Sequence, residues 1–179
     1  APALADCDPV AFGSLYKQKV FLSSSVSDIA DLATDGDAIE KLQKAAKKID
    51  ESLAQKYWDD CNTLSAEGKA VFDKERDAAD ELVDAYQKLL AAGDESSAYD
   101  VEYQLTQLRN IDFDLADDMV DAAIAASGAC DPESGADCKK ADEETVKART
   151  KLLGDPEREI EQYKKAWEHG REAVKKATP

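Results

Sequence analysis

Two rows of acidic residues have a spacing that could do chemistry. The first row is Asp77, Asp80, Glu81 and Asp84, and the second is Asp114, Asp117, Asp118 and Asp121. Steps of three and four residues place the carboxylates of each row on one face of a helix, where like charges repel one another. Carboxylate oxygens are the ligands that Ca²⁺ and related hard cations prefer. The rows are therefore candidate sites for a divalent or other multivalent cation, or for a cationic partner.

A plainer interpretation of these rows is favoured: they are the solvated sides of two amphipathic helices. No segment matches the calcium-binding loop of an EF-hand. The chain has a single histidine, His169, which lies off the apolar face of its segment and is expected to be solvated. A carboxylate-bridged di-iron site needs two Glu-x-x-His motifs and is excluded. We therefore expect no cofactor.

Four cysteines, Cys7, Cys61, Cys130 and Cys138, are the second chemical feature. They allow three pairings, of which the simplest joins Cys7 to Cys61 and Cys130 to Cys138. A Cys₄ metal site is the alternative, although no Cys-x-x-Cys spacing is present. Disulfides form in oxidising compartments, and the first five residues, APALA, are typical of the trimmed start of an exported chain. We therefore expect a secreted or periplasmic protein.

The charge excludes several classes of function. The 179 residues include 39 acidic and 23 basic side chains, a formal charge of −16, and no apolar stretch long enough to span a membrane. Such acidity is incompatible with the cationic footprint that nucleic acid or an anionic membrane surface requires. Catalytic triads and phosphate-binding glycine loops are absent as motifs, so no enzyme is predicted. Residues 139–179 hold 11 basic and 9 acidic side chains, which places the excess of acid in residues 1–138.

Apolar residues recur at helical spacing along almost the whole chain, and no strand pattern is present. Four long helices are expected in residues 9–34, 38–60, 66–92 and 98–127, followed by two shorter ones in 142–153 and 156–174. Short connections favour antiparallel neighbours. The predicted fold is all-α: an antiparallel up-down four-helix bundle with an additional C-terminal helical hairpin. We expect a single domain over 1–179, with the four helices in 1–129 and the disulfide loop and hairpin of 130–179 packed on them.

The same register predicts which side chains are buried. The apolar face of the first helix is expected to hold Phe12, Leu15, Phe21, Leu22, Val26, Ile29 and Leu32. Most aromatic residues of the chain fall on or beside such faces and are expected in the core. All four cysteines are expected at one end of the bundle. If antiparallel helices join near residue 95, part of the two acidic rows shares one surface.

The sequence thus predicts an acidic, disulfide-stapled helical bundle that binds or interacts with a partner without catalysis. We expect the partner to be an unidentified protein or a cationic species. Two alternatives stay open: binding of multivalent cations through the acidic helix faces, and transport of a small apolar ligand in the bundle core.

Overall fold

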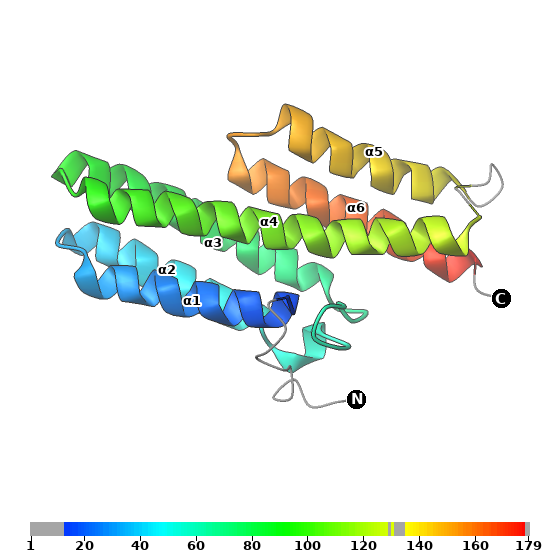
Figure 1. The fold of residues 1–179 in the computed structure, drawn as a ribbon, viewed down its shortest axis with the longest axis horizontal. Coiled ribbons are helices and arrows are strands. Elements are labelled where there is room, and N and C mark those ends of the chain that lie inside the picture. Colours follow the sequence, from blue (N-terminus) through cyan, green and yellow to red (C-terminus); the bar gives the residue numbers. More distant parts are fainter. Residues whose placement is uncertain (1–12, 129, 131–134, 178–179) are drawn as a thin grey trace. The chain divides into compact units, whose positions relative to one another are not determined.

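The computed structural model describes residues 13–128, 130 and 135–177, and in this part of the chain all regular structure is helical. The helices labelled in Figure 1 are α1 (Leu15–Leu32), α2 (Gly36–Ser52), α3 (Lys69–Ala92), α4 (Glu95–Ala126), α5 (Gly135–Lys151) and α6 (Pro156–Ala177). A short 3₁₀ helix, η2 (Gln55–Tyr57), follows α2. The prediction of an all-α fold is confirmed. Among the described helices, none combines the length and apolar character that a membrane span requires.

The helix starts follow local capping chemistry. The Asp35 carboxylate caps α2 by accepting from the Ala38 N–H at 2.8 Å, and Asp155 caps α6 by accepting from the Arg158 N–H at 3.3 Å. The cap of α6 agrees with the predicted start at residue 156, whereas α2 begins at Gly36, slightly earlier than predicted. The predicted start of the first helix, after Asp8, lies outside the described residues. In the structure Ser14 caps α1, accepting from the Lys17 N–H at 3.3 Å.

The segment between α2 and α3 differs from the prediction. Helix α2 ends at Ser52, well before residue 60, and α3 begins at Lys69, later than predicted. The indole N–H of Trp58 donates to the Ser52 carbonyl at 2.9 Å, and the Ser65 hydroxyl donates to the Lys56 carbonyl at 2.6 Å. These bonds, between residues six and nine positions apart, satisfy carbonyl groups that further helical turns would otherwise satisfy, so the chain folds here as an ordered loop.

The chain divides into two compact units, Ala1–Ile111 and Asp112–Pro179, with the boundary inside α4. The prediction of a single domain stays a prediction. In the first unit α1 packs on α2 and α2 packs on α3. The Ser23 hydroxyl bonds the Ala46 carbonyl at 3.3 Å and the Asp50 carboxylate at 2.6 Å across the first of these contacts. Fully buried side chains of this core include Val26, Leu42, Ile49, Phe72, Leu82 and Leu89.

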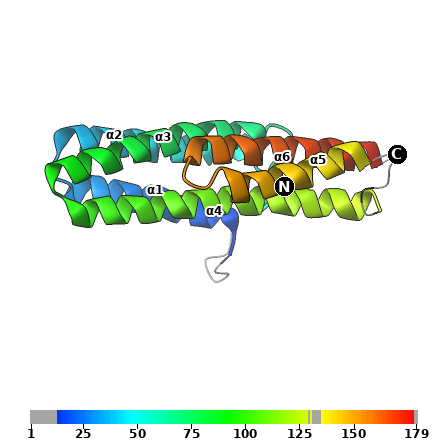
Figure 2. The ribbon, with the colours of Figure 1, turned by 90° about the horizontal axis from the view of Figure 1, so that it is seen from above.

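In the second unit, α5 and α6 form a hairpin, visible side by side in Figure 2, as predicted for the C-terminal residues. Ile160, Tyr163 and Trp167 are buried along the predicted apolar face of α6. Helix α6 also crosses the last part of α4 closely: a Cβ on Gly170 would lie 3.0 Å from the Met119 carbonyl oxygen. Helix α5 begins at Gly135, earlier than predicted.

Candidate functional site

The first acidic row lies on α3 and is paired with lysines of α2. Lys41 Nζ lies 2.9 Å from Glu81 and 2.7 Å from Asp84, and Lys48 Nζ lies 3.0 Å from Asp77. Asp80, the fourth member of the row, is exposed. The repulsion that suggested a metal ion is thus relieved by ammonium groups of the neighbouring helix. This pairing depends on which helix lies next to α3, and the spacing within α3 alone does not reveal it.

Two further pairs continue the series in both directions along the same two helices. Lys88 lies 3.2 Å from Asp37, and Lys74 lies 2.6 Å from Glu51. The hydrogen bond from Lys74 lowers the pKa of Glu51, and the same bond raises the pKa of the lysine. Along the series, residue numbers rise on α2 as they fall on α3, so the two helices are antiparallel with a fixed register.

The second acidic row, on α4 in the second unit, has a different environment. Partial desolvation, and then the charges of neighbouring aspartates, raise the pKa values of Asp114, Asp117 and Asp118. Arg149 of α5 acts in the opposite direction on the first two of these carboxyls. The carboxylates of this row therefore still repel one another, whereas most carboxylates of the first row are paired with lysines.

The acidic rows do not form a recognisable metal centre. Within the described part of the chain, no group of three or more His, Cys, Asp or Glu side chains has an arrangement that could hold a metal ion. The rows belong to different units, so the predicted surface shared by Asp77 and Asp114 stays a prediction. Cation binding at either row likewise stays a prediction.

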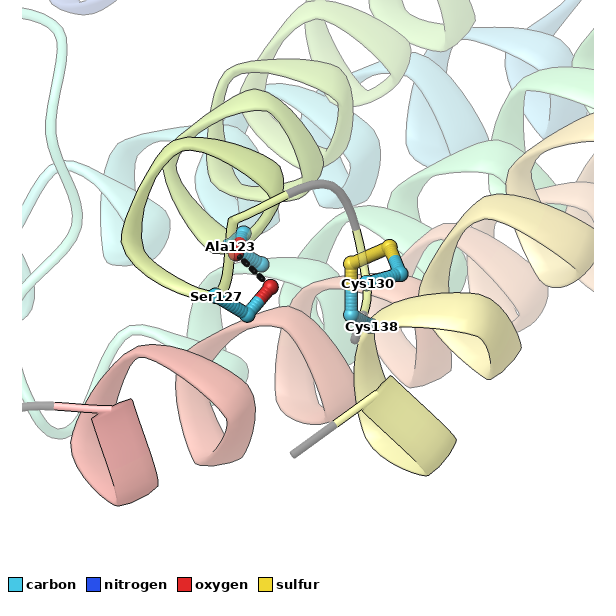
Figure 3. The surroundings of a disulfide bond; sticks show 4 residues. All are labelled: Ala123, Ser127, Cys130 and Cys138. Carbon is cyan, nitrogen blue, oxygen red and sulfur yellow. Dashed lines mark hydrogen bonds between the residues drawn. A yellow bond between two sulfur atoms is a disulfide. The ribbon is translucent and has the colours of Figure 1, made fainter. Parts of the chain in front are cut away.

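Two of the cysteines form a disulfide in the second unit, between Cys130 and Cys138 (Figure 3). Cys138 is fully buried with Ala123 of α4 and Ala173 of α6, and Cys130 packs against this cluster. At the end of α4, the Ser127 hydroxyl donates to the Ala123 carbonyl, one helical turn earlier, at 2.6 Å. The disulfide therefore joins the start of α5 to the segment that follows α4.

Cys61 is also disulfide-bonded, and its carbonyl accepts from the Tyr16 N–H at 3.0 Å, close to the start of α1. Cys7, its predicted partner, lies outside the described residues. Because the described cysteines are oxidised, they are not the thiolate ligands that the alternative Cys₄ metal site would need. The prediction that all four cysteines lie at one end spans both units and stays a prediction.

A buried ion pair that the sequence analysis missed lies in the first unit. Lys19 of α1 donates to the Glu75 carboxylate of α3, and both side chains have no solvent-exposed surface. The same carboxylate oxygen accepts from the Ser52 hydroxyl at 2.8 Å. The Lys19 ammonium also lies 5.8 Å from the ring centre of Trp58, within the range of a cation–π contact. Complete burial makes this cluster part of the core and denies access to a substrate.

The sequence does carry a signal for this pair. Lys19 occupies the apolar row of α1 between Leu15 and Leu22, and Glu75 occupies the row of α3 between Phe72 and Ala79. A charged residue in an apolar row at helical spacing indicates either a long side chain reaching solvent or a buried partner on another helix. In this protein each of the two charged residues has a buried partner on another helix.

An open groove lies between α1 and the first part of α4, with a volume of about 230 Å³. Both walls belong to the first unit, and their residues are Gln18, Phe21, Leu22 and Ser25 of α1 and Tyr103, Gln104, Gln107 and Ile111 of α4. The Phe21 side chain is 68% exposed and that of Tyr103 is 54% exposed. Aromatic rings and uncharged amides thus line a concave surface that solvent reaches.

The exposure of these rings corrects the sequence prediction. Phe21 and Leu32 were expected on the buried face of the first helix, but both side chains are more than half exposed. Tyr99 and Tyr103 are also more than half exposed, and are exceptions to the expectation that most aromatic residues are buried. The buried row of α1 contains Leu15, Leu22, Val26 and Ile29. At 100° per residue, Phe21 and Leu32 point about 90–110° away from the centre of that row, so spacing alone grouped them wrongly.

His169 of α6 is half-buried against two carboxylates of α5, and so differs from the expected solvated histidine. Its Nδ1 lies 3.7 Å from Asp137, and its Nε2 lies 3.9 Å from Glu144. Asp137 also accepts from Lys176, which lowers the pKa of this carboxyl, and Glu144 accepts from Gln162. This cluster holds the α5–α6 hairpin together.

Comparison with known proteins gives no relative from which a function could be transferred. No protein-family model matches the chain, and neither a curated protein nor a solved structure matches it. The function must therefore be argued from the geometry.

Proposed function

We propose that this is a non-catalytic binding protein, and that its first unit binds a partner protein through the groove between α1 and α4. The observation that carries the proposal is the exposure of two aromatic side chains, Phe21 and Tyr103, at one concave surface. Exposed clusters of this kind are typical of protein interaction sites, because burying such side chains against a partner is favourable. Tyrosine and phenylalanine are also among the residues that contribute most to binding at interfaces.

The proposal includes the architecture and the compartment. We propose that α1, α2, α3 and the first part of α4 form an up-down four-helix bundle. The antiparallel register of α2 and α3 and the short connections support this arrangement. We also propose an extracellular or periplasmic location, which the oxidised cysteines support.

The geometry favours this function over the two alternatives. The lysines of α2 already neutralise most of the first acidic row, so a cation would have to displace them. A carrier needs an enclosed apolar cavity, whereas the groove is open and partly lined by the amides of Gln18, Gln104 and Gln107.

Site-specific photo-crosslinking tests the proposal. A photoreactive phenylalanine derivative replaces Phe21 in one variant and the exposed Lys44 of α2 in a control variant. Each is irradiated in the extracellular or periplasmic fraction of the source. We expect one discrete protein adduct from position 21 and none from position 44, and we expect Tyr103→Asp to abolish it. Equal labelling from both positions, or no adduct at position 21, would refute the proposal.

A further inference from the structure

Exposed side chains continue along both helices beyond the residues that line the groove. On α1, Asp28 and Leu32 follow Phe21 at helical spacing on the same side, and Leu32 is 75% exposed. On α4, Tyr99 and Asp100 precede Tyr103 by about one turn, and Tyr99 is 70% exposed. Helices α1 and α4 run in opposite directions within this unit (Figure 1), so these two extensions lie along the same part of the surface. The result is an elongated apolar strip.

Two acidic groups lie along this strip. Asp28 of α1 and Asp100 of α4 are both exposed. Among the described residues, neither carboxylate forms an ion pair, in contrast to the first acidic row on α3. The basic residue on the same side of α1 is Lys17, which lies about one turn before Phe21 and is half-buried. The border of the strip therefore has a net negative charge.

We propose that this surface, which we call the α1–α4 strip, binds a cationic amphipathic helix of a partner protein. The inference rests on the proposed function and deepens it by naming the chemical class of the partner. Apolar side chains of such a helix, at intervals of three and four residues, pack against Phe21, Tyr103 and Leu32. Its lysine or arginine side chains reach Asp28 and Asp100 at the border.

The same charges argue against a second copy of this chain as the occupant. A symmetric dimer through the strip would bring the aspartates of both copies together, in a protein whose formal charge is −16. Like charges facing one another across an interface disfavour association. An acidic or neutral helix would leave the border carboxylates unpaired or repelled.

Three synthetic helical peptides of about 18 residues, close to the length of α1, test the proposal. The first is amphipathic, with leucine at helical spacing and lysine on the flanks. The second carries glutamate in place of every lysine. The third has the composition of the first in a scrambled order without an apolar face. Binding to the full chain is measured by fluorescence anisotropy at about 0.01 M and about 0.15 M salt.

We expect the first peptide to bind at least about tenfold more tightly than either of the others, and more tightly at low salt. Phe21→Asp should weaken its binding by about tenfold or more. The matched control is Leu90→Asp, which adds the same charge at an exposed leucine of α3 outside the strip and should leave the affinity nearly unchanged. Asp28→Asn combined with Asp100→Asn should weaken binding at low salt and have little effect at high salt.

Each other outcome overturns the inference in an identifiable way. Equal binding of the scrambled peptide means non-specific charge attraction, and equal binding of the acidic peptide means that the border charges select nothing. Binding of none of the three, together with a crosslink at position 21, refutes the cationic helix but leaves the proposed function standing. A dimer in sedimentation that Phe21→Asp dissociates would identify a second copy as the occupant.

Discussion

At the scale of single residues, the ion pair of Lys19 and Glu75 is the most costly arrangement in the first unit. Both charges are removed from water, and the second oxygen of the Glu75 carboxylate is buried without a hydrogen-bond partner in the described structure. The direct pair, the hydroxyl of Ser52 and the cation–π contact of Lys19 with Trp58 offset part of this desolvation. Each charge is therefore retained in the core by the other.

Removing one member of this pair should destabilise the protein strongly. Glu75→Gln leaves the Lys19 ammonium buried without its counter-charge, and we expect the free energy of unfolding to fall by about 3–5 kcal/mol. Lys19→Met should have a similar effect. The double variant Lys19→Met with Glu75→Leu removes both charges and should cost less than either single change. Denaturant unfolding monitored by circular dichroism measures all three.

The control for this experiment is Lys44→Met, at an exposed position of α2, which should change the stability little. Additive losses in the double variant would contradict the buried pair, because independent residues contribute independently.

Two aspartates of the acidic rows should respond to pH in opposite directions. Partial burial raises the pKa of Asp77, but hydrogen bonds from Lys48 and Arg76 outweigh it, so the pKa is lowered overall. Ionised Asp77 therefore contributes stability that is present at neutral pH and is lost as the pH falls through its folded pKa. Desolvation and neighbouring charges raise the pKa of Asp117, so its ionisation costs stability, and that cost disappears in acid.

We expect Asp77→Asn to lower the stability at pH 7 and Asp117→Asn to increase it, each by at most about 1 kcal/mol, because both groups are partly solvated. The Asp117 difference should vanish as the pH falls below about 4, the ordinary pKa of an aspartate in the unfolded chain. The Asp77 difference should vanish only at a lower pH, below the lowered pKa of this carboxyl in the folded protein. Thermal unfolding of the wild type and both variants between about pH 2 and pH 7 measures the effect. A change of the same sign for the two variants at pH 7 would contradict it.

At the scale of helices, the ion pairs between α2 and α3 connect an acidic row to the packing. Exposed pairs of this kind stabilise weakly, each by about 0.2–1 kcal/mol in measured cases. Their larger role is to select one register. Sliding α3 by one turn would place Asp37 opposite Asp84 in one direction, or Lys41 opposite Lys88 in the other. The acidic row is thus half of an interface, and its other half is the lysine row of α2.

Helix propensity and packing make opposite predictions for Gly170, in the interior of α6. Propensity alone would favour alanine in a helix by about 1 kcal/mol. However, a Cβ there would lie 2.9 Å from the Met119 Cγ and 3.0 Å from the Met119 carbonyl oxygen, so α4 and α6 would have to separate. We expect Gly170→Ala to destabilise the protein by about 1–3 kcal/mol, the range typical of overpacking.

The matched control is Gly36→Ala at the start of α2, where a new Cβ would meet nothing within 4 Å. This variant should be neutral or slightly more stable than the wild type in the same thermal unfolding experiment. If Gly170→Ala were stabilising too, the close crossing of α4 and α6 would be wrong.

At the scale of the molecule, the chain divides into two units inside α4. We therefore expect a destabilising substitution in one unit to lower the stability of that unit alone. The Cys130–Cys138 disulfide closes a short loop, and removing such a crosslink costs about 2–3 kcal/mol in the chain-entropy account. We expect Cys130→Ser with Cys138→Ser to lower the stability of residues 112–177 by this amount. Amide hydrogen exchange should become faster there, while residues 13–111 keep their wild-type rates.

A uniform increase in exchange over both ranges would show that the two units unfold together and would favour the single domain predicted from the sequence. The control is Ser127→Ala, beside the disulfide, which removes a hydroxyl bonded to the Ala123 carbonyl and leaves the crosslink intact.

What the sequence alone determines about this protein is the set of features that depend on near neighbours. The helical class, the capping by Asp35 and Asp155 and the end of α3 at Gly93 follow from residues within a few positions of one another. The buried face of α6 follows from its regular spacing. The ordered loop between α2 and α3 could not be predicted in this way. Part of it is held to α1 by bonds from the Leu15 N–H to the Asn62 side chain and from the Tyr16 N–H to the Cys61 carbonyl, and these depend on the folded arrangement.

Only the tertiary structure decides how each helix is rotated and which helix lies beside it. Phe21 is exposed because the neighbours of α1 bury a row about 100° away from it, and spacing on α1 is compatible with either choice. Asp77 is neutralised by a lysine 29 positions away, and Lys19 by a glutamate 56 positions away. Residues so far apart in the sequence leave no local pattern that would reveal their pairing. The groove, the buried ion pair and the surface ion pairs are therefore defined only once the helices pack together.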